Sequence, residues 1–197
     1  MTLLASQARI HGLRALLLSC LLSVLVALPI NALSGDAPLK VRSAHTELAN
    51  GLYLLNATID YRLTPNLEEA LHNGVKLTFE VQVEISRGRD WIWDATVAEL
   101  SQRYRLEYHA LSRLYVLTHL NTGVKRTFYR LESALFTLGE LDELPLLDAS
   151  LLQDGQEYEA RVRARLRVDA LPLPLRVRGY VMRDWSPASD WYTWSLR

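Results

Sequence analysis

Residues 75–85 read VKLTFEVQVEI, an unbroken alternation of apolar and polar side chains. Because successive side chains of a strand point to opposite faces of a sheet, this stretch predicts a β-strand with one buried and one solvated face. Residues 158–168, YEARVRARLRV, repeat the alternation and place arginine at most of the polar positions. Long half-buried strands of this kind are typical of antiparallel sheets.

The rest of the chain predicts further strands and two short helices. Periodicity and turn residues place strands at 40–48, 52–63, 91–100, 103–109, 114–120, 125–130, 175–181 and 191–196, with hairpin turns at 50–51 and 121–123. One helix begins at Pro65 behind a Thr64 cap and stops at Asn73-Gly74, and the other spans 131–138 before Gly139. We therefore expect an all-β fold, an antiparallel β-sandwich of immunoglobulin-like general architecture with two short helices.

Residues 1–32 have the features of a secretory leader. Arg9 and Arg14 precede an apolar run, ALLLSCLLSVLVAL at 15–28, and Ile30-Asn31-Ala32 offers a cleavage site. We expect a signal peptide, or an N-terminal membrane anchor if it is not cleaved, followed by a single domain over 33–197. The expected location is the periplasm, or the inner membrane facing the periplasm. Cys20, the only cysteine, lies in this leader, so the domain has no disulfide and no thiolate ligand.

Charge and motifs argue against several classes of function. The 22 basic and 22 acidic residues balance, and no global field attracts nucleic acid. No serine-nucleophile motif and no glycine-rich phosphate loop occurs. The histidines of the domain, none at metal-ligand spacing, are His45, His72, His109 and His119. We predict no metal, no cofactor and no catalytic residue.

A hydrolase is the enzymatic alternative. Asp90 and Asp94 flank Trp91 and Trp93, and sugar hydrolysis needs two carboxylates beside an aromatic surface. Burial of the two tryptophans on one face of a strand is the simpler interpretation.

A row of arginines is the first candidate binding surface. Four share the polar face of the 158–168 strand and two more lie on the polar face of the strand predicted at 175–181: Arg161, Arg163, Arg165, Arg167, Arg176 and Arg178. Glu80 and Glu84 form a complementary pattern, so cross-strand charge pairing is one interpretation. The other is a surface that binds an acidic protein partner or the anionic headgroups of a lipid or glycolipid.

The C-terminal tryptophans are the second candidate surface. Trp185, Trp191 and Trp194 form an aromatic-rich end of the chain. Trp191 and Trp194 cannot share one face of a regular strand, so we expect at least one of them to be partly exposed. Closure of the core by the last strand is the alternative to an aromatic platform for a sugar or peptide.

Several strings resemble an uncharacterised family of exported proteobacterial proteins known only as a domain of unknown function. The most specific are YRLEYHAL at 104–111 and LPLPL at 171–175; NGVKLTF at 73–79, WIWD at 91–94 and a late Asp184-Trp185 accompany them. The resemblance covers essentially the whole chain, leader included. It implies a β-rich envelope domain, and no activity. Members are often encoded beside a nitrogen-regulation-type sensor kinase, which implies a link to envelope sensing.

These observations predict a non-catalytic exported envelope protein that binds a protein partner, accessory to sensing by a sensor kinase. Binding of lipopolysaccharide or acidic phospholipid through the arginine-rich face is the alternative. Membrane contact is expected only through an uncleaved leader.

Overall fold

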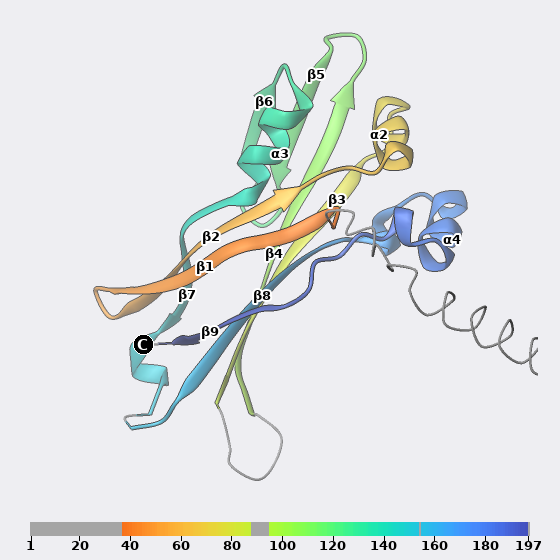
Figure 1. Cartoon of the computed structure of the whole chain (residues 1–197). Helices are drawn as coiled ribbons and strands as arrows, with labels where there is room; N and C mark the ends of the chain where they lie inside the picture. The colour runs from red at the N-terminus through yellow and green to blue at the C-terminus, as the bar shows by residue number, and fades with distance from the viewer. Residues whose placement is uncertain (1–36, 88–94, 154, 197) are drawn as a thin grey trace, which may run out of the picture. The chain divides into compact units, whose positions relative to one another are not determined.

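The computed structural model describes residues 37–87, 95–153 and 155–196, which form two antiparallel sheets (Figure 1). The first sheet has the order β1-β2-β7, with β1 at Leu39–Ala49, β2 at Leu52–Tyr61 and β7 at Glu140–Asp148. The second has the order β6-β5-β4-β3-β8-β9, with β3 at Leu77–Arg87, β4 at Ala95–His109, β5 at Leu114–His119, β6 at Lys125–Phe128, β8 at Tyr158–Leu166 and β9 at Tyr192–Leu196. The all-β sandwich with short helices is therefore confirmed.

The two sheets share a main hydrophobic core, and Ile85, Leu147, Tyr158 and Ala160 form a second, smaller cluster. The apolar positions of β3 and β8 point into these two clusters, and Leu77, Phe79, Val81 and Val162 in the main core are at most 1 % exposed. Leu39, Leu55 and Ile59 reach the main core from the first sheet. Each fully buried side chain of this size contributes about 1.5–3 kcal/mol to folding, so the alternation at 75–85 and 158–168 carries much of the stability.

Two predicted helices are confirmed. α2 spans Pro65–His72, and the Thr64 hydroxyl accepts a hydrogen bond from the Leu67 amide at 3.4 Å. α3 spans Leu131–Gly139. The described chain also has three single turns of 3-10 helix, η1 at Ala149–Leu151, η2 at Val168–Ala170 and η3 at Arg183–Trp185. No helix within the described ranges has the length and apolarity needed to cross a bilayer.

The strand predicted at 175–181 is wrong, because this segment is a third helix, α4, at Leu173–Val181. Pro172 stands at its N-cap and Pro174 in its first turn, where a fixed φ and a missing amide favour a helix start. The apolar residues of this stretch fit a period of 3.6 as well as a period of 2. The proline pair decides between the two.

Two other strands differ from the predicted pattern. β7 was not predicted, and β4 runs as one strand from residue 95 to 109, where strands at 91–100 and 103–109 were predicted. β7 hides its periodicity because Glu143 has a φ of 47° and the pairing with β2 shifts register twice. Bulges of this kind interrupt the alternation that a sequence pattern relies on.

The predicted turns at 50–51 and 121–123 are confirmed. Asn50 and Gly51 both have positive φ, 52° and 79°, as a two-residue hairpin loop of type I′ requires. Gly123 also has a positive φ, 77°, and joins β5 to β6.

Gly139 fixes how α3 lies against β2. A Cβ at this position would lie 2.0 Å from the carbonyl oxygen of Ile59. Only glycine permits that approach, so the last turn of α3 lies directly on the β2 backbone.

Candidate binding surface

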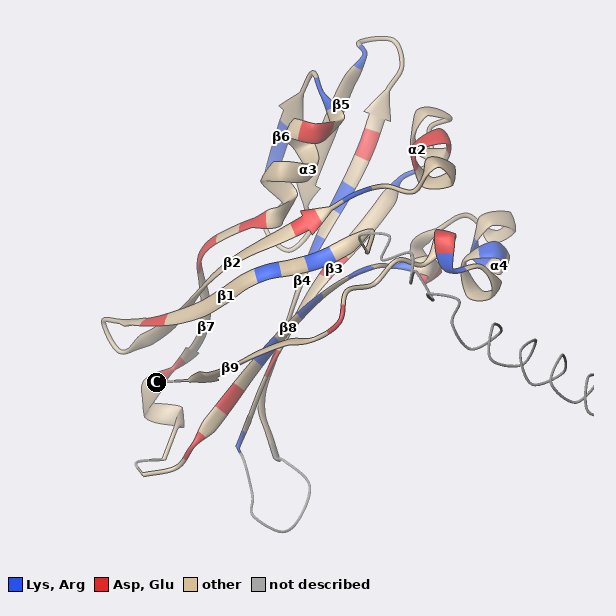
Figure 2. Cartoon of the chain, viewed as in Figure 1, with Lys and Arg blue, Asp and Glu red and all other residues tan. Residues whose placement is uncertain are grey.

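The outward face of β8 carries three of the predicted arginines in register with polar residues of β3. Arg161 pairs with Glu84, Arg163 with Gln82 and Arg165 with Glu80. Arg161 Nε donates to Glu84 Oε2 at 2.9 Å, and Arg165 Nε donates to Glu80 Oε2 at 2.8 Å. Figure 2 shows the resulting row of basic positions along β8. Cross-strand pairing therefore accounts for Arg161 and Arg165.

Glu80 is the centre of this charge network. Its side chain is 4 % exposed and accepts hydrogen bonds from Ser101 Oγ at 2.7 Å and from Arg167 at 3.2 Å, while Arg103 Nε lies 3.4 Å away. Burial raises the pKa of this carboxyl, but the hydrogen bonds of Ser101 and Arg165 and the charges of the arginines outweigh it, so its pKa lies below the ordinary value. Glu80 is therefore a buried anion that holds several arginines in place.

Arg167 has two acidic neighbours. Its guanidinium contacts Glu80 on β3 and donates to Asp169, which lies two residues further along the chain. The hydrogen bonds and charge of Arg167 lower the pKa of Asp169 to about 2, although partial burial opposes this shift. Asp169 is thus ionised at neutral pH and anchors the end of the arginine row.

Arg163 differs from its neighbours because its hydrogen-bond partner is neutral. Its Nε donates to the Gln82 side chain at 2.8 Å, and no ion pair of Arg163 is present in the described ranges. Its guanidinium carbon lies 4.3 Å from the centre of the Trp191 ring, and that of Arg161 lies 4.6 Å from the same centre. Trp191 is half-buried. Contacts of this kind hold a cation over an aromatic face without neutralising it.

We call this group the arginine cluster, and define it as Arg103, Arg161, Arg163, Arg165, Arg167 and Trp191. Its arginines contact three carboxylates, Glu80, Glu84 and Asp169. Because Glu99 and Glu159 lie on the same face at the Arg161 end of the row, the positive excess lies towards Arg163, Arg165 and Arg167. Each guanidinium has five donors in a planar fork, and the bonds described use only some of them. The cluster presents ordered, partly free donors on the outer face of the sheet.

Arg176 and Arg178 do not join the cluster. Both lie on α4, and Arg176 donates to the carbonyl of Leu171 at 3.1 Å. The prediction that they share a sheet face with Arg161–Arg167 is wrong, because a helix replaces the expected strand.

The three tryptophans have three different environments. Trp185 is only 6 % exposed and belongs to the core, so its prediction as a surface aromatic is wrong. Trp194 is half-buried, packs against the core and donates from Nε1 to Thr46 Oγ1 at 3.3 Å, which ties β9 to β1. Among these three tryptophans in the described chain, Trp191 is the one that contacts arginines of the cluster, Arg161 and Arg163.

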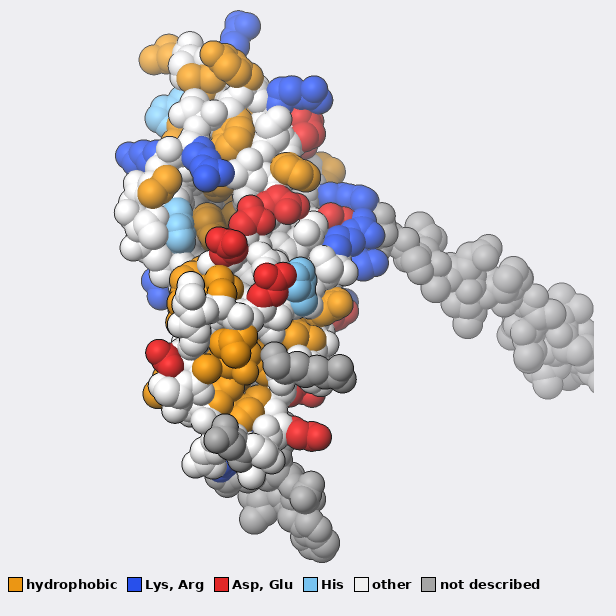
Figure 3. Space-filling model, turned by 90° about the vertical axis from the view of Figure 1, so that its left-hand side faces the viewer, with side chains coloured by type: hydrophobic (Ala, Val, Ile, Leu, Met, Phe, Trp, Pro, Cys, Tyr) orange, Lys and Arg blue, Asp and Glu red, His pale blue; other side chains and the backbone are white. Residues whose placement is uncertain are grey.

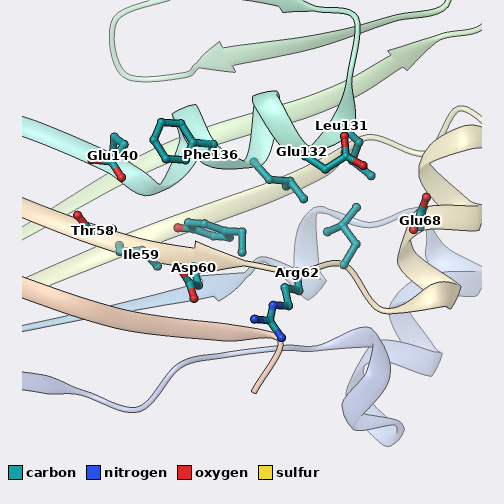
Figure 4. A pocket seen from close by; sticks show the side chains of 12 residues that line it. Thr58, Ile59, Asp60, Arg62, Glu68, Leu131, Glu132, Phe136 and Glu140 are labelled. Atoms are coloured by element: carbon teal, nitrogen blue, oxygen red, sulfur yellow. The ribbon is translucent and has the colours of Figure 1, made fainter. Parts of the chain in front are cut away.

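A pocket of about 410 Å³ lies between β2, α2 and α3. Figure 4 shows the carboxylates of Asp60, Glu132 and Glu140 spread along it rather than gathered at one point. Asp60 is bound by Arg42, and Glu132 is paired with Arg130. Among the residues that the structure describes, no three His, Cys, Asp or Glu side chains are placed to hold a metal ion.

A second pocket of about 310 Å³ lies on the inner side of β4, β5 and β6, beside α3. His119 stacks on Tyr104 with ring centroids 4.5 Å apart, and its ring nitrogens contact Gln102 at 2.8 Å and Thr122 at 3.0 Å. Desolvation lowers the pKa of His119 below its ordinary value. Both ring nitrogens of His119 are hydrogen-bonded to protein side chains, Gln102 and Thr122.

A family model described as a domain of unknown function, DUF4390, matches residues 36–195. The chain belongs to the DUF4390 family. No curated protein and no solved structure matches it. The predicted resemblance to a family known only as a domain of unknown function is therefore confirmed for residues 36–195.

Two sets of predictions for the DUF4390 chain lie outside the described residues. They concern the leader with Cys20 and the carboxylate pair Asp90 and Asp94 with Trp91 and Trp93. These predictions therefore stay predictions.

Sequence reasoning missed one member of the arginine cluster in the DUF4390 domain, Arg103, and one contact within the cluster, that of Trp191 with the arginines. Arg103 was not singled out, although its alternation with Arg105 on β4 was readable. The contact between Trp191 and the arginines was not predicted, because Trp191 precedes β9 and its direction depends on the backbone there. The neutral Gln82 between Glu80 and Glu84 was the readable signal that Arg163 would lack an acidic partner.

The charges of the DUF4390 domain are not uniform over its surface. Figure 3 shows a face on which acidic side chains gather near the middle and hydrophobic side chains reach the surface below them. Because the 22 basic and 22 acidic residues balance over the whole sequence, a positive excess at the arginine cluster is local.

Proposed function

We propose that this protein is a non-catalytic, exported protein of the cell envelope that binds an acidic protein partner through the arginine cluster. The leader at 1–32 supports export, since it has a basic start, an apolar run and a cleavage triplet. The family resemblance supports a link to envelope sensing.

The observation that carries the proposal is the pair Arg163 and Trp191. Tryptophan and arginine dominate the few residues that supply most of the energy of protein interfaces. Here Trp191 holds Arg161 and Arg163 against its ring, and Gln82 fixes Arg163 without neutralising it. A partner carboxylate would meet a cation that is already ordered, so little side-chain entropy would be lost on binding.

Charge reversal tests this proposal in the intact chain. Crosslinked envelopes should yield a specific co-purifying protein with the wild type, and Arg163→Glu should remove it. Lys40→Glu makes the same charge change at an exposed position of β1 and should leave it in place. Equal recovery with all three chains, or no specific protein at all, contradicts the proposal.

An anionic envelope ligand, lipopolysaccharide or acidic phospholipid, is the second candidate. It is favoured by the positive excess of the cluster over Glu80, Glu84 and Asp169. Binding of either ligand to the wild type should weaken with salt and be lost in Arg163→Glu. Binding that is insensitive to both changes contradicts this alternative.

A further inference from the structure

α4 presents an apolar stripe to solvent. Its members are spaced by four, three and one residues, so they share one side of a helix: Leu173, Val177, Tyr180 and Val181. Their exposed fractions are 71 %, 66 %, 70 % and 78 %. Met182, next in the chain, is 53 % exposed. Contiguous exposed apolar side chains of this kind mark an interaction site more often than a bare surface.

The opposite side of α4 faces the domain. Gly179 is buried, and a Cβ there would lie 2.4 Å from Val168 Cγ1. Leu175 is half-buried and packs against the core. At about 100° per residue, Gly179 and Leu175 lie across the helix from the stripe. The side of α4 that carries Gly179 and Leu175 therefore packs against the domain, and the apolar stripe on the other side is exposed to solvent.

Arginines flank the stripe. Arg176 and Arg178 lie on its two sides, and Arg183 follows the helix. No carboxylate pairs with these three in the described ranges. Between residues 171 and 186 the only acidic residue is Asp184. Figure 2 shows the basic positions of α4 at this end of the second sheet. An apolar stripe between cationic flanks is the pattern of a helix that lies in a membrane interface.

The described chain also starts at this end of the domain. The Arg62 amide donates to the Pro38 carbonyl at 2.7 Å, and the Thr64 hydroxyl donates to the Asp184 carbonyl at 2.8 Å. Figure 1 shows the start of β1 on the same side as α4. Residues 29–36 separate the apolar run from Ala37 and reach at most about 29 Å when extended. A leader retained in a bilayer would therefore bring the membrane within reach of α4.

We infer that α4 docks in the plane of an anionic phospholipid surface, with Leu173, Val177, Tyr180 and Val181 in the interface and the arginines at the headgroups. The helix has nine residues, about 14 Å long, whereas a span needs about 20 residues. The contact is therefore with the surface of the bilayer. Tyr180 lines a pocket together with Arg165 and Arg167, so this surface borders the arginine cluster without including Arg163 or Trp191.

A fluorescent label in the stripe tests the inference in the full chain. Cys20→Ser removes the native thiol, and Val177→Cys takes an environment-sensitive nitrobenzoxadiazole label. The protein is reconstituted in phosphatidylcholine vesicles with or without phosphatidylglycerol, and spin-labelled lipid is the quencher. Leu111→Cys, in the exposed turn between β4 and β5, is the matched control.

Phosphatidylglycerol vesicles should shift the emission of the label at 177 to the blue and allow its quenching, while the label at 111 stays in water. Arg178→Gln should lower the ratio of docked to free α4 about fivefold. This factor corresponds to the roughly 1 kcal/mol that each arginine near an anionic membrane surface contributes to binding. Lys40→Glu, at an exposed position of β1 outside both surfaces, should leave the response of the label at 177 unchanged.

Three outcomes overturn the inference. The first is a blue shift and quenching that are equal for the labels at positions 177 and 111, or absent for the label at position 177. The second is loss of the response in Arg163→Glu but not in Arg178→Gln, which assigns the lipid contact to the arginine cluster. The third is a response that depends on protein concentration without lipid, which assigns the stripe to a second copy of the chain.

Discussion

The guanidinium carbon of Arg163 lies 4.3 Å from the centre of the Trp191 ring, and the only side chain to which Arg163 is hydrogen-bonded in the described chain is the neutral Gln82. Its neighbours Arg161 and Arg165 instead bind the carboxylates of Glu84 and Glu80. The register of β3 against β8 produces this difference, because it places Gln82 opposite Arg163. One cation of the row thus remains uncompensated while being held in position.

Replacing Glu80 should cost more stability than replacing Glu84. Glu80→Gln removes the charge of a buried carboxylate that contacts three arginines. We expect the free energy of unfolding to fall by about 1–3 kcal/mol, a range that already allows for the partial exposure of those arginines. Glu84→Gln breaks a more exposed pair, Arg161–Glu84, and should cost less than about 1 kcal/mol. Urea unfolding of both variants measures the difference. Equal losses would show that Glu80 does not organise the cluster.

The contribution of Glu80 should depend on pH in one direction. Its pKa lies below the ordinary value of 4.5, so the folded state favours the ionised carboxylate. The stabilisation is complete above pH 4.5 and is lost as the pH falls through the lower pKa of the folded state. The difference in unfolding free energy between the wild type and Glu80→Gln should therefore become smaller as the pH is lowered from 5 to 3. A difference that stays constant down to pH 3 would exclude this role.

Gly139→Ala should destabilise the domain by about 1–3 kcal/mol or more, because the added Cβ collides with backbone. The colliding atom, the Ile59 carbonyl oxygen, would lie 2.0 Å from that Cβ and cannot move without displacing β2. Ser133→Ala, at an exposed position of the same helix, is the control and should be neutral or slightly stabilising. Thermal unfolding monitored by circular dichroism compares the two. A Gly139→Ala variant as stable as the wild type would contradict the close approach of α3 to β2.

The fold was predictable where one physical rule dominated. The alternation at 75–85 and 158–168 identified β3 and β8, and capping residues identified α2. The segment 173–181 was misassigned because its apolar spacing satisfies two periods. β7 escaped because the positive φ of Glu143 and two register shifts break its alternation.

The candidate site was predictable only in part. The sequence placed Arg161, Arg163, Arg165 and Arg167 together, and it offered Glu80 and Glu84 as partners. It could not place Arg176, Arg178 and Trp185, because their positions depend on a helix and on the core. The contact of Trp191 with Arg163 depends on backbone that no periodicity describes.

Site-specific photocrosslinking in the cell envelope tests the central claim most directly. Thr193 is exposed and lies opposite Arg161 in the sheet, so a benzoyl-phenylalanine at this position borders the arginine cluster. The account predicts one discrete protein adduct from position 193, none from the exposed turn residue Leu111, and loss of the adduct in Arg163→Glu. No adduct from position 193, or one that persists in Arg163→Glu, would contradict the account.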